Sequence, residues 1–393
     1  MFDYKLDKSI ILRTGFNPYY KKIQSELGDN IIIDNKSFIN LASNNYLGLA
    51  NDKRIKAAAV NAINKYGLSL CGTPIATGYN DLYKKTEDKI SNFLDLGDAL
   101  IFSSCYQANN GLFSALVNKN DVVFVDHFAH SSLIQGIKGS ECRVSPFLHN
   151  NITHLESLLK NTKKGRNKFV VTESVFSTQG DIAPFNEINE LCNKYQAMFI
   201  IDDSHGIGVI GKKGKGIIEY DRVNNFSGIY TASLGKAIAN AGGVICGEKK
   251  IIEYLRYNIA HLIYSTAITP SVLGGILRTF EIIEKEYYEI STNMRKNKKI
   301  IYNSLKQAGF DVIENKTLIN SIKCGDQIKT IMLAKYFYEE NILVTPFIEP
   351  SVPKNRGVVR LIIQANLDNE IINELIEKIG KIGKKYNEAF CNL

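Results

Sequence analysis

The chain has 393 residues, of which 45% are apolar and 22% charged, a composition typical of a globular protein. At about 100–200 residues per domain, this length predicts two or three domains, whose cores need neither disulfides nor metal ions for stability. No window approaches the roughly 18 uncharged apolar residues of a membrane span. The start of the chain also lacks the apolar stretch of a signal peptide.

Lysine and arginine exceed aspartate and glutamate by eight, which favours anionic partners such as nucleic acid, phosphate ligands or acidic surfaces. Because these charges are spread along the chain, a surplus of solvated surface lysines is the simpler explanation. No zinc spacing or aromatic–basic stripe indicates binding to nucleic acid. The seven cysteines include no CxxC pair, so they predict reduced thiols in a cytoplasmic protein and no metal site.

An N-terminal arm is predicted over residues 1–45, followed by a large domain over 46–290. Five short runs in this domain are apolar throughout and are separated by helix-like stretches: 122–126, 169–173, 198–203, 228–233 and 242–246. Runs of this kind, apolar without alternation, are typical of strands buried on both faces of a parallel sheet. The sequence therefore predicts an α/β fold with a mostly parallel sheet.

After about residue 270 the chain becomes rich in isoleucine, glutamate and lysine. One or two long helices are predicted over 277–308, a strand over 358–363 and an amphipathic helix over 369–386. These elements predict a smaller α+β domain over 291–393.

Polar residues follow several predicted strands, at the sheet edge where open α/β sheets bind ligands. One strand ends in Asp202, where a carboxylate can hold a protonated ring nitrogen, and His205 can hydrogen-bond the same ring. The alternative is a capped loop with a satisfied histidine. After the next strand, Ser233 can donate to a phosphate. Lys236 is placed to form a Schiff base, unless it is one of the many surface lysines.

Three further segments carry similar chemistry. Residues 102–109 predict a turn into a helix whose free N–H groups favour an anion, although an ordinary helix start fits equally well. No partner base accompanies Cys105 there, so a nucleophilic role is not favoured. His130 suits stacking on a planar cofactor or burial with a hydrogen-bond partner, and residues 173–181 end a strand with hydroxyls or form a turn. A lysine, a carboxylate, a stacking histidine and two anion-binding turns together are the groups that bind pyridoxal 5'-phosphate (PLP).

Motifs that run in one order over about residues 40–365 resemble those of the α-oxoamine synthases, a family of fold-type-I PLP-dependent transferases. They are LASNNYLGLA (41–50), ATGY (76–79), SSCYQANNG (103–111), FAHSSL (128–133), FLHNN (147–151), ESVFSTQGDIAP (173–184), IDDSHGIGVIG (201–211), TASLGKA (231–237), HLIYSTAITP (261–270) and VPKNRGVVRL (352–361). The resemblance implies a large PLP-binding domain with a mostly parallel sheet and a smaller α+β C-terminal domain.

The resemblance also implies roles around the cofactor ring. Lys236 bonds to PLP and later moves the α-proton of the substrate. Asp202 keeps the pyridine nitrogen protonated, and His205 hydrogen-bonds the ring hydroxyl. His130 stacks on the ring, and Ser177 lies near it.

Further implied roles concern the phosphate and the substrate. The backbone of Cys105 and Tyr106, together with Ser233, binds the phosphate of PLP. Thr266 reaches the phosphate of a neighbouring subunit, because family members are homodimers with shared active sites. Arg360 binds the amino-acid carboxylate, a bidentate task that suits a guanidinium, and Asn44 approaches the substrate.

The implied reaction is a decarboxylative Claisen condensation of a small amino acid with an acyl-CoA or another acyl thioester, which gives an α-amino ketone. FAHSSL and FLHNN resemble the autoinducer-synthase branch and predict a fatty amino ketone. HLIYST and ATGY are more similar to 8-amino-7-oxononanoate synthase, which joins L-alanine to a pimeloyl thioester, and this is the alternative. Another fold-type-I aminotransferase or lyase is a second alternative. Three departures from the family pattern leave the substrates open. Tyr83 stands where the family has a histidine, Gly72-Thr73-Pro74 replaces the Gly-Thr-Arg of some branches, and QANL stands at 364–367.

Overall fold

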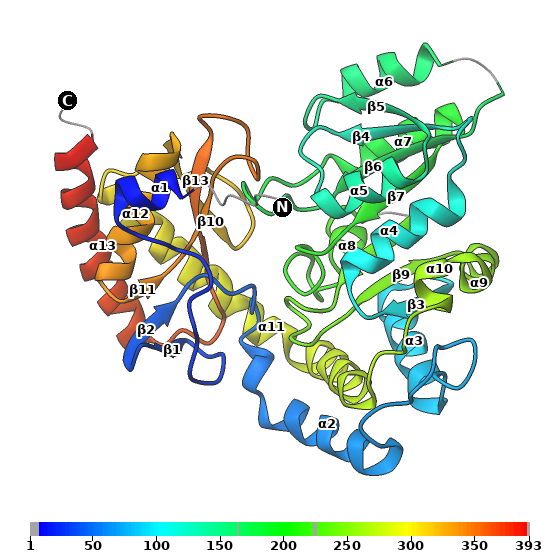
Figure 1. Cartoon of the computed structure of the whole chain (residues 1–393), viewed down its shortest axis with the longest axis horizontal. Helices are drawn as coiled ribbons and strands as arrows, with labels where there is room; N and C mark the ends of the chain where they lie inside the picture. The colour runs from blue at the N-terminus through cyan, green and yellow to red at the C-terminus, as the bar shows by residue number, and fades with distance from the viewer. Residues whose placement is uncertain (1–7, 163–164, 223–225, 391–393) are drawn as a thin grey trace, which may run out of the picture. The chain divides into compact units, whose positions relative to one another are not determined.

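The structure, a computed structural model, describes residues 8–162, 165–222 and 226–390 (Figure 1). They form two compact units. The larger unit consists of Leu49–Ser177 and Asp181–Glu289, and the smaller one of Thr178–Gly180 with the described parts of Met1–Gly48 and Ile290–Leu393. The residues of the predicted N-terminal arm therefore cluster with the C-terminal segment, and helix α11, Pro270–Gln307, contributes to both units.

A seven-stranded sheet forms the centre of the larger unit, with the strand order β3-β9-β8-β7-β6-β4-β5. Its strands are β3 (Asp98–Phe102), β4 (Val122–Asp126), β5 (Arg143–Phe147), β6 (Lys168–Glu173), β7 (Met198–Asp202), β8 (Ile229–Ser233) and β9 (Gly243–Gly247). Neighbours from β5 to β8 are parallel, whereas β9 is antiparallel to both β8 and β3. The predicted α/β architecture with a mostly parallel sheet is confirmed.

All five predicted strands are present, but the direction of β9 was not predicted. Its direction follows from the short connection 234–242, since a parallel return needs a crossover of about a dozen residues or more. The two outermost strands, β3 and β5, were not predicted either. β5 is an edge strand with four of its five residues exposed or half-buried, so it lacks the continuous apolar run of a central strand.

The larger unit also contains helices, several of which pack against its sheet (Figure 1). They are α2 (Lys53–Tyr66), α3 (Asp81–Leu94), α4 (Cys105–Leu116), α5 (Ser131–Gly139), α6 (Ile152–Lys160), α7 (Phe185–Tyr195), α8 (Ile217–Tyr220), α9 (Lys249–Asn258), α10 (Ala260–Ile263) and the first part of α11, with a 3-10 turn at Leu49–Asn51. Phe113 of α4, Leu133 of α5 and Leu255 of α9 share one buried cluster with strand residues such as Val123 and Ile200. This burial, at about 25 cal/mol per Å² of apolar surface, fixes the helices that carry polar residues at the strand ends.

The smaller unit contains two three-stranded sheets. One joins the hairpin β1 (Asn30–Ile33) and β2 (Lys36–Asn40) to β11 (Ile342–Leu343). In the other, β13 (Gly357–Ile362) lies between β10 (Ile319–Gly325) and β12 (Thr345–Phe347), antiparallel to both. Its helices are α1 (Ser9–Thr14), α12 (Gln327–Glu339), α13 (Asn369–Phe390) and the end of α11.

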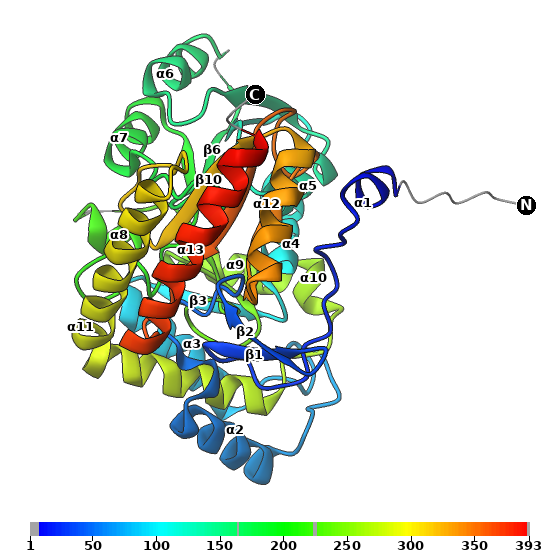
Figure 2. The same cartoon turned by 90° about the vertical axis from the view of Figure 1, so that its left-hand side faces the viewer.

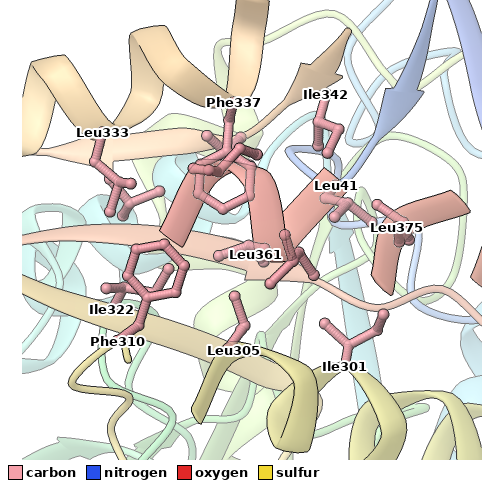
Figure 3. Close-up of a cluster of buried hydrophobic side chains, with 14 of the residues drawn as sticks. Leu41, Ile301, Leu305, Phe310, Ile322, Leu333, Phe337, Ile342, Leu361 and Leu375 are labelled. Atoms are coloured by element: carbon pink, nitrogen blue, oxygen red, sulfur yellow. The ribbon is translucent and has the colours of Figure 1, made fainter. Parts of the chain in front are cut away.

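Helices α12 and α13 pack side by side in this unit, drawn in orange and red in Figure 2. Figure 3 shows the core that they cover, where Phe310, Phe337, Leu361 and Leu375 lie among other buried apolar side chains. The long helix predicted over 277–308 is a single helix that begins at Pro270, a residue preorganised for the first helical position. Within the described residues, no helix has the length and apolarity that crossing a membrane requires.

Candidate active site

The carboxyl ends of three neighbouring strands place polar residues in one row of the larger unit. Glu173 on β6 pairs with Asp202 on β7, and Asp202 pairs with Thr231 on β8. The Asp202 carboxylate is buried, with Oδ2 accepting from the Asn109 amide at 2.8 Å and Oδ1 from the Ser204 N–H at 3.0 Å. Both donors are neutral, so this buried anion is matched to a cationic ligand.

The adjacent carboxylate, Asp203, has a different role. Successive strand residues face opposite sides, and Asp203 accepts from the Ser174 hydroxyl, from the Tyr230 hydroxyl at 2.9 Å and from the Ile217 N–H at 3.1 Å. Burial raises the pKa of Asp203 to about 7, against the effect of these hydrogen bonds. Asp203 therefore joins β6, β8 and the start of α8, and Asp202 alone is available to a ligand.

A chain of hydrogen bonds connects Asp202 to His130. The Asn109 amide that donates to Asp202 also donates to the Ser132 hydroxyl at 2.9 Å. That hydroxyl lies 2.8 Å from Nδ1 of His130, and the Ser132 N–H donates to the same nitrogen at 3.2 Å. His130 is thereby fixed as the N-cap of α5, with Nδ1 as an acceptor.

The first turn of α4 forms a surface suited to an anion. The Ser204 hydroxyl lies 3.4 Å from the Cys105 sulfur and accepts from the Ser233 N–H at 2.9 Å. A Cβ at Gly243 would lie 2.3 Å from the Cα of Cys105, so glycine is required where β9 meets this turn. Because the first N–H groups of a helix have no partner within it, this turn can bind a phosphate beside Ser233.

Lys236 lies close to these groups, in the turn after β8. Burial and the charge of Asp202 raise the pKa of both Cys105 and Glu173, and the Lys236 ammonium opposes that rise at both. Burial also lowers the pKa of His130, with Asp202 acting against that and Lys236 adding to it. A raised thiol pKa argues against Cys105 as a nucleophile.

The remaining predicted residues of the larger unit have fewer defined contacts. His205 is buried in the turn after β7, three residues from Asp202. Ser177 is half-buried in the loop after β6, and Tyr106 is exposed on the first turn of α4. Thr266 is exposed, and its carbonyl accepts from the Ser103 hydroxyl at 3.5 Å.

The smaller unit brings together the two residues expected to bind substrate. Nη2 of Arg360, on β13, donates to the Asn44 side-chain oxygen at 3.2 Å. The guanidinium carbon lies 4.8 Å from the ring centre of Phe347. Burial lowers the pKa of Arg360, whose usual value is so high that the guanidinium stays charged. A buried cation of this kind is matched to an anionic ligand such as a carboxylate.

Asn109, Ser132 and Ser204 were not predicted to belong to the site. Each lies close to a predicted residue in sequence, since Ser132 and Ser204 are two positions after His130 and Asp202. Asn109 lies one turn after Cys105 on α4, and this helical spacing was the signal that could have placed it in the site. Tyr83, the departure from the family pattern, is buried and donates its hydroxyl to the Ile101 carbonyl at 2.6 Å.

The chain is similar to known proteins over most of its length. Residues 36–379 match the model of the family described as "Aminotransferase class I and II". The chain is 32% identical to an 8-amino-7-oxononanoate synthase of Thermosipho melanesiensis, over 98% of this chain and 99% of that protein. It is 30% identical to a serine palmitoyltransferase of Sphingobacterium spiritivorum, over 94% of this chain and 93% of that protein.

Solved structures agree on the fold. A serine palmitoyltransferase variant from S. paucimobilis, solved with a bound PLP–myriocin aldimine, superposes with a TM-score of 0.93. The match covers 97% of each chain at 23% identity, and at that identity it establishes the fold alone. The predicted fold-type-I transferase fold is confirmed.

Proposed function

We propose that this chain is an 8-amino-7-oxononanoate synthase. The chain belongs to the aminotransferase class I and II family and, within it, to the PLP-dependent α-oxoamine synthases. An 8-amino-7-oxononanoate synthase condenses L-alanine with a pimeloyl thioester and releases CO2 and the free thiol. The predicted family and enzyme class are confirmed. The relatives described above favour this alternative over the fatty amino ketone of the autoinducer branch, which was the main prediction.

The observation that carries the proposal is the fit of the site to PLP. The buried carboxylate of Asp202, with neutral donors on both oxygens, suits a protonated pyridine nitrogen. The first turn of α4, with Ser233 beside it, suits the phosphate. Lys236 supplies an amine for the aldehyde, near His130, which is held in place by Ser132.

When bound, PLP supplies an electron sink that stabilises negative charge on the α-carbon of the amino acid. The residues of the chain bind, orient and move protons around that sink. With PLP bound, Asp202 would keep the pyridine nitrogen protonated, His130 would lie over the ring and His205 would donate to the ring hydroxyl. We assign removal of the α-proton to Lys236, whose amine lies near Cys105 and His130.

The amino acid is bound through its carboxylate. Arg360 presents a buried guanidinium next to Asn44, and a guanidinium binds a carboxylate through two parallel hydrogen bonds. We therefore assign the substrate carboxylate to Arg360, with Asn44 as a second polar contact. Once the acyl group is joined, that carboxylate leaves as CO2.

A homodimer is part of this proposal. The exposed large side chains of the larger unit include Ile75 (53%), Tyr257 (63%) and Tyr264 (85%). Ile75 and Tyr257 line one pocket, and Tyr264 lies two residues from Thr266. Exposed apolar groups of this size favour burial by a partner. A second copy bound there would bring its Thr266 to the phosphate site of the first. Light scattering on the purified protein should give twice the chain mass, whereas a monomer would refute the shared site.

The substrate pair is tested by a matrix of amino acids and acyl thioesters. L-alanine, L-serine and glycine are each combined with pimeloyl, octanoyl and palmitoyl thioesters on CoA and on a carrier protein. The release of free thiol and the product mass are measured. The proposal predicts the largest kcat/KM with L-alanine and a pimeloyl thioester. A preference for L-serine with a palmitoyl thioester would instead favour the activity named for the serine palmitoyltransferase relative.

A further inference from the structure

A histidine that the proposed reaction does not use connects two loops of the site. His149 follows β5, and its imidazole lies between two carboxylates of the larger unit. Nδ1 is 3.0 Å from Oδ1 of Asp126, and Nε2 is 3.3 Å from Oδ2 of Asp181. Asp126 ends β4 and Asp181 lies in the loop after β6, so one ring joins segments far apart in sequence.

The surroundings hold this ring in one orientation. It packs 4.6 Å from the ring centre of Phe128 and edge-on at 4.3 Å from that of Phe176. Asp126 is fully buried and accepts from the Phe128 N–H at 2.8 Å and from the Asn150 N–H at 2.9 Å. Asp126 is therefore fixed by the backbone, and His149 supplies its charge partner.

The charge of the imidazole follows from its neighbours. Burial alone lowers the pKa of His149, but hydrogen bonds to Asp126 and Asp181, with their charges, raise it to about 9. Among the residues that the structure describes, the charged groups facing the ring are these two carboxylates, one from β4 and one from the loop after β6. The Asn150 amide, 3.4 Å from Nε2, is a neutral polar neighbour of the ring. At neutral pH both ring nitrogens therefore act as donors.

Each carboxylate belongs to a loop that carries a predicted cofactor contact. In the first loop, the Ala129 N–H donates to the Asp126 carbonyl at 3.0 Å, and His130 is the next residue. In the other loop, the Phe176 N–H donates to the Asp181 carbonyl at 2.9 Å, and Ser177 is the next residue. Movement of either carboxylate would therefore displace His130 or Ser177.

We propose that His149 is a positioning residue that holds the His130 loop and the Ser177 loop together through Asp126 and Asp181, and so keeps the PLP site in its binding geometry. This inference rests on the proposed function, because the loops matter through the cofactor that they contact. The bridge exists only while the imidazole carries both protons. Its effect on cofactor binding is therefore lost once the ring loses one.

The test compares His149→Phe, which keeps an aromatic ring but removes both hydrogen bonds, with Asp181→Asn, which keeps the shape and removes one charge. His154→Gln is the matched control, since this nearby imidazole accepts from the Leu148 N–H and touches neither carboxylate. Thermal unfolding first confirms that each variant is folded. Asp181 is 30% exposed in its side chain, so that variant should fold even where His149→Phe does not.

Two readouts are used. Imidazole NMR of the protein without cofactor should show a resonance that titrates near pH 9 in the parent, moves to lower pH in Asp181→Asn and is absent from His149→Phe. Equilibrium binding of PLP should be about tenfold weaker in His149→Phe than in the parent at pH 7.5, with the difference gone at pH 10. Asp181→Asn should lose its affinity at a lower pH than the parent, and His154→Gln should behave as the parent.

The outcomes separate the two claims. A parent that binds no PLP at any pH overturns the proposed function, and with it the positioning role. A parent that binds PLP while His149→Phe and Asp181→Asn bind it equally well at every pH overturns the positioning role alone. A His149 resonance that titrates near the ordinary histidine value also overturns it. A purely structural histidine would lower thermal stability without producing a pH-dependent ratio of affinities.

Discussion

Removal of the Asn109 side chain should break the link between Asp202 and His130. In Asn109→Ala, Asp202 loses a donor at 2.8 Å and the Ser132 hydroxyl loses one at 2.9 Å, both inside the protein. A hydrogen bond to a charged group contributes about 1.5–3 kcal/mol and a neutral one about 0.5–1.5 kcal/mol, so the free energy of unfolding should fall by about 2–4 kcal/mol. Loss of about 1.4 kcal/mol in holding Asp202 would also weaken PLP binding about tenfold.

The neighbouring asparagine supplies the control. Asn110 donates to the carbonyls of Tyr106 and Ser132 at 2.9 and 3.1 Å and makes no contact with a carboxylate in the described structure. Asn110→Ala should therefore cost about 1–2 kcal/mol and leave PLP affinity unchanged. Urea unfolding of the cofactor-free protein and equilibrium PLP binding measure both quantities. If the two variants lose equal stability and bind PLP alike, the Asp202–Asn109–Ser132–His130 chain does not support the site.

Three further substitutions test the roles of Arg360, Tyr83 and Asp203. Arg360→Lys replaces a bidentate guanidinium with a single ammonium, so the KM for the amino acid should rise about 10–100-fold, with that for the acyl thioester unchanged; equal rises in both would contradict the assignment. Tyr83→Phe removes a buried hydroxyl, which should cost about 1 kcal/mol of stability without altering the product; a changed product mass would place Tyr83 in substrate selection. Asp203 is an acid whose pKa rises on folding from 3.8 to about 7, so the folded state binds more protons and the free energy of unfolding should fall as pH rises from about 4 to 7. Denaturation at pH 5 and 7.5 should show this loss in the parent and not in Asp203→Asn; equal losses would assign it to other groups.

The fold was predictable where one physical rule dominated. Buried parallel strands are apolar throughout, and that pattern located β4, β6, β7, β8 and β9. The direction of β9 was not predictable from the pattern, because apolarity does not distinguish parallel from antiparallel pairing. The edge strand β5 was missed because its exposed residues and a proline lack that pattern.

Site residues were predictable only where the residue type and its position after a strand indicated a chemical role. Asp202 ends a strand and Lys236 follows one, but the sequence does not show that Asp203 turns into the core to meet Ser174 and Tyr230. Asn109 was missed because its role depends on a hydrogen bond to Asp202, which is 93 residues away in sequence. His149 lies within the FLHNN motif, but no role was predicted for it because its two partners lie on different loops.

Whether Lys236 holds PLP can be tested by reducing the protein with borohydride in the presence of PLP and locating the modified residue by peptide mass. A Schiff base between PLP and Lys236 should give visible absorbance before reduction and one covalent pyridoxyl group on the peptide that contains Lys236. Lys236→Ala should lack both, while it still unfolds cooperatively. A colourless protein, or a pyridoxyl group on other lysines with Lys236 unmodified, would show that Lys236 does not hold the cofactor.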